Sequence, residues 1–229
     1  KLNEGDFVTV IGGNGAGKST MLNAVAGTWP VDEGQILIDN IDVTKLSEHK
    51  RATYLGRVFQ DPMTGTAATM GIEENLALAK RRGKSRLLRS GITKAEREEY
   101  KELLKILGLG LEDRLTSKVG LLSGGQRQAL TLLMATLQKP KLLLLDEHTA
   151  ALDPGAAEKV MALTKKIVEE NKITTLMITH DMEYALEYGS RTIMLDSGKI
   201  VMDLTGKERE EMTTGKLAEL FYGKAHKRG

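Results

Sequence analysis

Short apolar runs alternate along the chain with longer segments of mixed polarity. Residues 7–11, 141–146 and 173–179 form aliphatic runs bounded by glycine or polar residues. Such continuous runs are typical of strands that are buried on both faces of a sheet. Residues 35–39 instead alternate between apolar and polar side chains, which favours a half-exposed antiparallel strand. Another strand is expected to end within residues 57–60.

The segments between these strands carry helical spacing. Helices are predicted over residues 19–26, 72–79, 94–107 and 126–138, from residue 154 onward, and from about residue 181 to 188. Asp153 suits an N-cap because its carboxylate can accept a backbone hydrogen bond, and Pro154 suits the first helical position. Residues 191–196 and 199–203 are expected to pair as a hairpin around Ser197-Gly198.

Strands that alternate with helices predict an α/β fold with a mostly parallel, helix-covered sheet and an antiparallel β portion. We expect one domain over residues 1–229. Within it, residues 1–60 and 140–229 are predicted to form the core. Residues 61–139 carry helical spacing and few strand signals, and are predicted to be a helical lobe inserted into that core.

Composition narrows the possible functions only modestly. The 229 residues include 33 Lys and Arg against 31 Asp and Glu, and a net charge of +2 argues against a protein that coats nucleic acid. The absence of cysteine excludes disulfides, thiolate zinc sites and a cysteine nucleophile. No apolar run approaches the roughly 18 residues that span a bilayer, and residues 1–6 lack a signal-peptide layout. If the protein acts at a membrane, it would therefore have to bind other subunits there.

A glycine-rich loop follows the first predicted strand. It fits the phosphate-loop pattern G-x-x-x-x-G-K-[ST] at every fixed position, with the residues Gly12, Gly13, Asn14, Gly15, Ala16, Gly17, Lys18 and Ser19, and Thr20 directly after them. Glycines let successive backbone N–H groups point at phosphate oxygens, and the following helix adds its positive end. Lys18 would reach the β- and γ-phosphates, and Ser19 would offer its hydroxyl to Mg²⁺. The alternative is a glycine-rich turn that contains Lys-Ser by chance. The buried strand before the loop and the helix after it favour the phosphate loop over that alternative.

Asp146 and Glu147 follow the four leucines of another predicted central strand. Ligand sites of open α/β sheets lie at the carboxyl ends of the strands. Asp146 would therefore complete the Mg²⁺ shell, and Glu147 would polarise an attacking water. Taken alone, two such carboxylates could instead decorate the surface or cap a helix, but the phosphate loop favours the metal and catalytic interpretation.

The segment Leu122-Ser123-Gly124-Gly125-Gln126 precedes a predicted helix. Its serine hydroxyl and free N–H groups can bind a second anion, although they could also be a plain helix cap. With Gln60, Asp146-Glu147, Ala151-Leu152-Asp153 and His180 in this order after the phosphate loop, the sequence resembles the ATP-binding-cassette (ABC) ATPases. The resemblance covers nearly the whole chain. It implies a P-loop NTPase (RecA-like) core with an inserted helical subdomain.

The resemblance also implies roles for individual residues. Ser123, Gly124, Gly125 and Gln126 would contact the γ-phosphate of ATP bound to a second copy of the chain, in a head-to-tail homodimer. Gln60 would sense Mg²⁺ and the attacking water, and His180 would orient that water and Glu147. Asp153 would communicate across the dimer. Hydrolysis would proceed by in-line attack of water on the γ-phosphate, with Lys18, Gln60, Glu147 and His180 as catalytic residues.

Two features depart from the family pattern. His148 stands where proline usually follows the catalytic glutamate. The family also stacks adenine on an aromatic side chain well before the phosphate loop, and only 11 residues precede Gly12 here. We expect a first strand to be missing from this sequence, so adenine preference is implied by the family and not by a nameable residue.

The resemblance further implies a peripheral protein at the cytoplasmic face of the cell membrane. It would energise a bacterial importer of amino acids, including aromatic ones. An integral-membrane permease and an extracytoplasmic solute-binding protein would be its partners, and nucleic acid would not. Residues 60–79, with Met63, Thr64, Met70 and Ile72, are expected to form the groove that receives the permease.

Other functions remain open at this stage. The nearest is an exporter ATPase with a separate permease. A soluble ABC ATPase that acts in DNA repair would need a long coiled coil. A soluble ABC ATPase that acts in translation would need two cassettes in one chain. A non-hydrolysing switch would not need Glu147 and His180.

Three remaining segments receive structural interpretations. Residues 80–89 hold six basic residues and no acid, which fits a solvated loop or a contact with anionic lipid headgroups. The single tryptophan, Trp29, is expected to pack against the core. Residues 226–229 are expected to fray.

Overall fold

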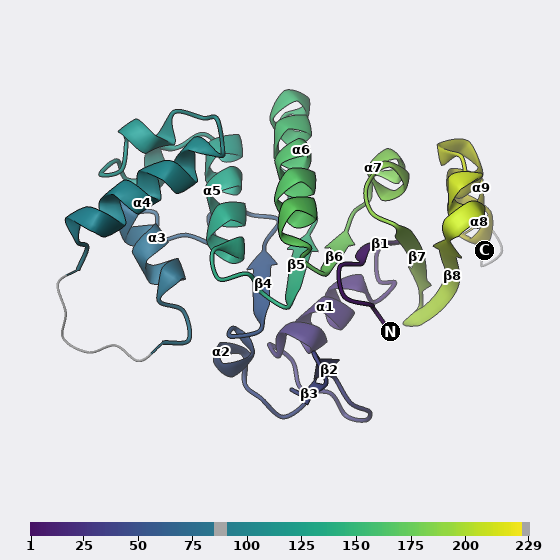
Figure 1. Cartoon of the computed structure of the whole chain (residues 1–229). Coiled ribbons are helices and arrows are strands. Elements are labelled where there is room, and N and C mark those ends of the chain that lie inside the picture. Colours follow the sequence, from purple (N-terminus) through teal and green to yellow (C-terminus); the bar gives the residue numbers. More distant parts are fainter. Residues whose placement is uncertain (85–90, 226–229) are drawn as a thin grey trace.

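In the computed structural model, which describes residues 1–84 and 91–225, a six-stranded sheet runs through the middle of the molecule (Figure 1). Its strands, in spatial order, are β4 (Leu55–Val58), β5 (Leu142–Asp146), β6 (Thr175–Ile178), β1 (Phe7–Gly12), β7 (Arg191–Asp196) and β8 (Lys199–Thr205). The first five strands are parallel, and β8 pairs antiparallel with β7. This arrangement confirms the predicted mostly parallel sheet with an antiparallel portion.

Helices cover both faces of the sheet (Figure 1). Helix α1 (Lys18–Ala26) lies on one face, and α5 (Gly124–Thr136), α6 (Pro154–Asn171) and α7 (Met182–Glu187) lie on the other. Beside α5 are α3 (Ile72–Lys80), α4 (Lys94–Lys105) and the 3₁₀ turns η1 (Leu111–Asp113) and η2 (Val119–Leu121). The remaining helices are α2 (Glu48–Arg51), α8 (Gly206–Glu210) and α9 (Thr214–Ala225). None of the helices in the described ranges is long and apolar enough to cross a bilayer.

The central strands bury both of their faces, as continuous aliphatic runs predict. On β5, Leu142 and Leu144 face the α1 side, whereas Leu143 and Leu145 face the α6 side. A separate apolar cluster joins α3, α4 and α5 around Leu76, Leu104 and Leu130. Helix α5 also sends Leu132 and Ala135 into the core beneath α6, so it packs against both clusters.

Most predicted elements are present. Asp153 is the N-cap of α6, where its Oδ1 accepts a hydrogen bond from the Ala156 N–H at 3.0 Å, and Pro154 is the first helical residue. The predicted hairpin is β7–β8, and its turn residues Ser197 and Gly198 have positive φ. Residue preferences within these short segments therefore predicted the start of α6 and the β7–β8 turn correctly.

Other expectations need correction. The predicted strand over residues 35–39 is reduced to β2 (Leu37–Ile38), because Asp39-Asn40 form a two-residue turn to β3 (Ile41–Asp42). Both turn residues have positive φ, as such turns require. Trp29 does not pack into the core, because it is 48% exposed. The short helix α2 and the helices α8 and α9 were not predicted.

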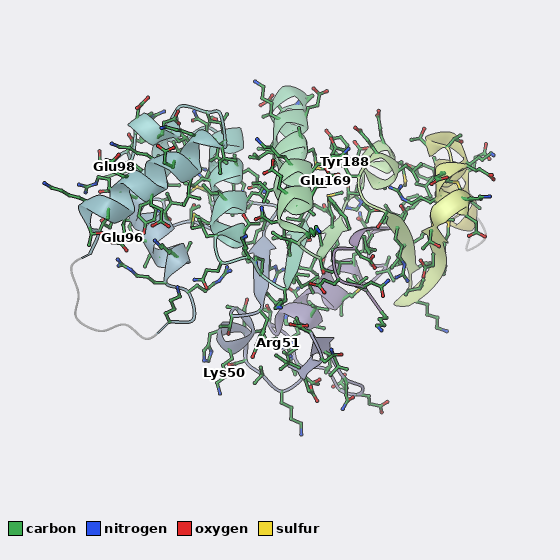
Figure 2. The ribbon with its side chains drawn as sticks, in the orientation of Figure 1. Lys50, Arg51, Glu96, Glu98, Glu169 and Tyr188 are labelled. Atoms are coloured by element: carbon green, nitrogen blue, oxygen red, sulfur yellow. The ribbon has the colours of Figure 1, made fainter. Side chains whose placement is uncertain are left out.

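Helix α1 ends on a buried cation. Arg51, the last residue of α2, is 1% exposed and lies below α1 (Figure 2). Its guanidinium donates to the carbonyls of Ala24 and Val25 at 2.6 and 2.9 Å, and to those of Thr44 and Leu46. A cation is favourable at a helix C-terminus, where carbonyls lack intrahelical partners. Arg51 thus holds the far end of the helix that follows the phosphate loop.

The basic segment is only partly described, because residues 85–90 lie outside the described ranges, as do residues 226–229. Its first cations contact the protein itself. Lys80 pairs with Glu99, Arg81 pairs with Glu96 at 3.1 Å, and Arg82 donates to the Ala135 carbonyl. A freely solvated loop therefore does not describe the start of this segment.

Candidate active site

The phosphate loop connects β1 to α1 through a turn that needs glycine. Gly15 and Gly17 have φ values of 76° and 100°, which only glycine adopts readily. The turn of the β7–β8 hairpin packs closely on this loop: the Gly198 N–H donates to the Ala16 carbonyl at 2.9 Å, and a Cβ on Gly17 would lie 3.3 Å from Gly198 Cα. Helix α1 follows the loop directly and has no side-chain cap at Gly17, so its first N–H groups are available to an anion.

Lys18 lies in this loop with its ammonium turned inward. The residue is 6% exposed, and its Nζ donates to the carbonyls of Gly12 and Gly13 at 2.7 and 3.2 Å. Burial lowers the pKa of Lys18, while the charges of Glu147 and Asp146 raise it. The cation is therefore held within the electrostatic reach of both predicted site carboxylates.

The predicted site residues from four parallel strands meet at one edge of the sheet. The register pairs Val58 with Leu145 and Val10 with Ile178. Continuing that register brings Gln60, after β4, level with Glu147, after β5, and brings Gly12 level with His180, after β6. Ligand sites form at this edge of open α/β sheets. Gln60 is exposed there, as are Ser19 and Thr20 at the start of α1.

Glu147 and His180 are in direct contact. The Glu147 Oε1 lies 2.6 Å from the His180 Nε2, and the two side chains are 15% and 47% exposed. Glu147 has a φ of 47°, which is uncommon for a residue with a Cβ, and its N–H donates to the Ile178 carbonyl at 3.0 Å. The half-exposed imidazole thus holds the carboxylate from the solvent side, in a geometry suited to a general base.

Asp146 has a partner that the sequence did not suggest. The Arg57 guanidinium, on β4, lies 3.3 Å from Asp146 Oδ2 and donates to Asn23 Oδ1 on α1 at 2.9 Å. It also stacks over the Phe59 ring at 4.5 Å. The position of Arg57 inside a predicted strand was the only hint of this contact in the sequence. Its partner, Asp146, depends on the register between β4 and β5, which the sequence alone does not predict.

The signature segment begins helix α5, as predicted. Ser123 is the N-cap, and it exchanges hydrogen bonds with Gln126 in a capping box. Gly125 lies against the first turn of α6, because a Cβ there would be 3.0 Å from Ala156 Cβ. Ser123, Gln126 and Asp153 line one cavity of about 390 Å³. Within the described ranges, no hydrogen bond or ion pair connects this group to the phosphate loop.

His148 is a buried neutral histidine. It is 2% exposed, its Nε2 lies 3.1 Å from the Thr164 hydroxyl, and burial lowers its pKa to about 4. The residue that replaces the usual proline is therefore buried against α6. Its position at the carboxyl end of β5 leaves its backbone carbonyl available to other segments.

The pKa of His148 predicts a loss of stability in mild acid. The unfolded chain takes up a proton near pH 6.5, whereas the folded chain does so only near pH 4. More protons bind to the unfolded state between these values, so the free energy of unfolding falls as pH drops, by at most about 3 kcal/mol. Urea unfolding between pH 7.5 and 4.5 should show this decline in the native protein and a shallower one in His148→Gln. His49→Gln, at an exposed site, should keep the native slope; parallel curves for native protein and His148→Gln would contradict the assignment.

Comparison with known proteins agrees with this geometry. A family model described as ABC transporter matches residues 1–150. A tyrosine transport ATP-binding protein of Clostridioides difficile (strain R20291) is 47% identical over 220 residues, which cover 96% of this chain and 87% of that protein. A methionine import ATP-binding protein of Rhizobium johnstonii is 37% identical over 87% of this chain, and the chain spans only 53% of that protein.

Solved structures give the same result. The dimeric post-hydrolysis state of the ATP-binding cassette MJ0796, bound to ADP and Pi, superimposes with a TM-score of 0.75 at 34% identity, covering 90% of this chain and 87% of that one. The ADP conformation of MJ1267, an ATP-binding cassette of an ABC transporter, gives a TM-score of 0.78 at 28% identity, with 97% and 89% covered.

Proposed function

Because the chain belongs to the ABC transporter family, we propose that it is the ATP-binding and ATP-hydrolysing subunit of an importer of amino acids or similar small solutes. The observation that carries the proposal is the convergence, at one sheet edge, of the phosphate loop with Gln60, Asp146 and the contacting pair Glu147–His180. A phosphate cradle beside a paired carboxylate is what nucleotide hydrolysis needs.

In this proposal the phosphate loop binds the triphosphate and Lys18 neutralises the charge on its β- and γ-phosphates. Gly12, Gly13, Asn14, Gly15, Ala16, Gly17, Ser19 and Thr20 supply the surrounding backbone and hydroxyl groups. Glu147 polarises the attacking water, and His180 holds the Glu147 carboxylate toward that water. Catalysis then depends on positioning and on stabilisation of developing charge.

Mg²⁺ fits the residues at this edge. Ser19 offers a hydroxyl, Asp146 a carboxylate and Gln60 an amide oxygen, and oxygen ligands are those that Mg²⁺ prefers. When bound, the ion would neutralise charge on the phosphates. Arg57 contacts one carboxylate oxygen of Asp146, Oδ2, at 3.3 Å.

A second copy of the chain completes the site in this proposal. Ser123, Gly124, Gly125 and Gln126 form the N-terminus of α5, and Asp153 lines the same cavity as Ser123 and Gln126. Their occupant is then the γ-phosphate of ATP on the other copy. The dimeric form of the relative MJ0796 supports this arrangement. Residues 61–139 act as the lobe that carries the signature, between the core segments 1–60 and 140–229.

The permease partner is expected to dock in a groove of about 510 Å³ between the core and the helical lobe. Phe59, Thr64, Leu78 and Met134 line it, together with Arg81 and Arg82. Thr64, one of the groove residues predicted from sequence, lines this groove. Ile72 was also predicted to line it, but that prediction is wrong, because Ile72 is fully buried in the lobe. The protein would therefore lie at the cytoplasmic face of the membrane.

The cargo proposed is an aromatic amino acid, supported by the 47% identity to a tyrosine transport protein. An extracytoplasmic solute-binding protein would deliver it, and nucleic acid has no part. An exporter ATPase with a separate permease, or a soluble ABC ATPase, is the alternative that the following experiment distinguishes.

Co-purification from the cells that make the protein tests the whole proposal. We expect a polytopic membrane protein and a solute-binding protein that binds tyrosine, phenylalanine or tryptophan. Leu78→Asp, in the groove, should lose the membrane partner while the isolated chain still hydrolyses ATP. Ile200→Asp, at an exposed position on β8, should keep it. Recovery of ribosomes or DNA-repair proteins instead would overturn the transport proposal.

A further inference from the structure

Gln128 is a fully buried polar side chain in the signature helix α5. It is 0% exposed, and its amide nitrogen donates to two backbone carbonyls. One is the carbonyl of Phe59, at 2.9 Å, and the other is the carbonyl of His148, at 2.6 Å. A single side chain thus connects α5 to two segments that are remote from it in sequence.

The two carbonyls lie next to the residues proposed for chemistry. Phe59 directly precedes Gln60, and His148 directly follows Glu147. Both carbonyls come after the ends of their strands, since β4 ends at Val58 and β5 at Asp146, so the sheet ladder does not hold them. Gln128 supplies the hydrogen bonds that the ladder does not.

The backbone conformation of Glu147 is one that requires support from neighbouring segments. Its φ of 47° is an unfavourable conformation for a residue with a Cβ and persists only where the surroundings hold it. The Ile178 carbonyl accepts from the N–H of Glu147 before its Cα, and Gln128 holds the carbonyl of the following residue, His148. The direction of the carboxylate is set by this backbone.

The other end of the Gln128 amide is its carbonyl oxygen. Its Oε1 is buried and accepts no hydrogen bond from the described part of the chain. Buried polar atoms are nearly always paired, so an exception calls for an explanation. A residue selected for packing alone would carry no such atom, so the two donated bonds are the reason for an amide here.

Helix α5 begins with the signature residues Ser123–Gln126, little more than one turn before Gln128. We propose that Gln128 is a positioning residue: it transmits the position of the signature helix to the backbone of Gln60 and Glu147, and so aligns both for hydrolysis when the signature engages the nucleotide of the second copy. This inference rests on the proposed function.

Two substitutions test it in the full chain. Gln128→Leu keeps the volume and removes both donors, and Gln128→Glu keeps the shape while replacing the donors with acceptors. Each is expected to lower kcat for ATP by about tenfold or more, with KM within about twofold. A thermal melt of each variant checks folding. Thr136→Val is the matched control, because within the described residues this buried hydroxyl of α5 donates only to carbonyls of its own helix.

A second readout separates positioning from packing. In the Glu147→Gln background, which removes the chemistry, Gln128→Leu should still bind fluorescent ATP with native affinity. A Gln128→Leu protein that folds and hydrolyses ATP at the native kcat, or that loses only KM, would overturn the inference. If Gln128→Leu does not fold, the same criteria apply to Gln128→Glu. The absence of ATP turnover in the native protein would instead contradict the proposed function itself.

Discussion

Glu147→Gln is expected to reduce ATP turnover by at least about 100-fold while leaving ATP binding intact. Loss of a general base typically costs two to four orders of magnitude in rate. The substitution is nearly isosteric, and the amide oxygen can still accept a hydrogen bond from the imidazole that lies 2.6 Å from the carboxylate. Only the negative charge that polarises water is removed.

The same variant should accumulate as a dimer in the presence of ATP. If hydrolysis separates the two copies, a chain that binds ATP without hydrolysing it remains closed. Phosphate release measures the first effect, and size-exclusion chromatography with ATP and Mg²⁺ measures the second. Glu183→Gln, in the first turn of α7, is the control for loss of a nearby carboxylate and should keep native turnover. Turnover of Glu147→Gln within a few-fold of native would refute the role of Glu147.

Lys18→Met is expected to weaken ATP binding, the step that precedes hydrolysis. The native ammonium is enclosed by the loop and donates to the Gly12 and Gly13 carbonyls. Methionine fills similar space without the charge. A charge-assisted contact of about 2–3 kcal/mol with the phosphates would be lost, which corresponds to roughly 30- to 160-fold weaker binding.

Titration with a fluorescent ATP analogue tests this expectation. Lys141→Met removes an exposed lysine that pairs with Asp39 on the surface, and it should bind like the native protein. Native affinity in Lys18→Met would show that the loop binds phosphate through its backbone alone. The contrast with Glu147→Gln, which binds but does not turn over, separates the two roles.

Sequence patterns predicted the features that depend on neighbours along the chain. The aliphatic run of β5 indicated burial on both faces, and Asp153-Pro154 located the start of α6 to the residue. The β2–β3 turn also had a local signal, since Asp39-Asn40 is a pair that tolerates positive φ. That signal was missed because the apolar alternation of the preceding residues was extended across it.

Contacts between distant segments were not predictable in the same way. The pairing of Arg57 with Asp146 requires the β4–β5 register, and the bonds of Gln128 require the depth at which α5 packs on the sheet. The Glu147–His180 contact was expected from family resemblance, and its geometry came from the positive φ of Glu147. Such contacts depend on tertiary packing, which a single sequence expresses only weakly.

The position of β1 in the sheet has a consequence for biosynthesis. This strand emerges from the ribosome well before its two neighbours, which are residues 175–178 and 191–195. A nascent chain that has reached only α5 has both edges of an aliphatic strand without partners, a form of chain that is prone to aggregate. The glycine-rich loop after β1 can therefore reach its folded form only after residues 175–195 have been synthesised.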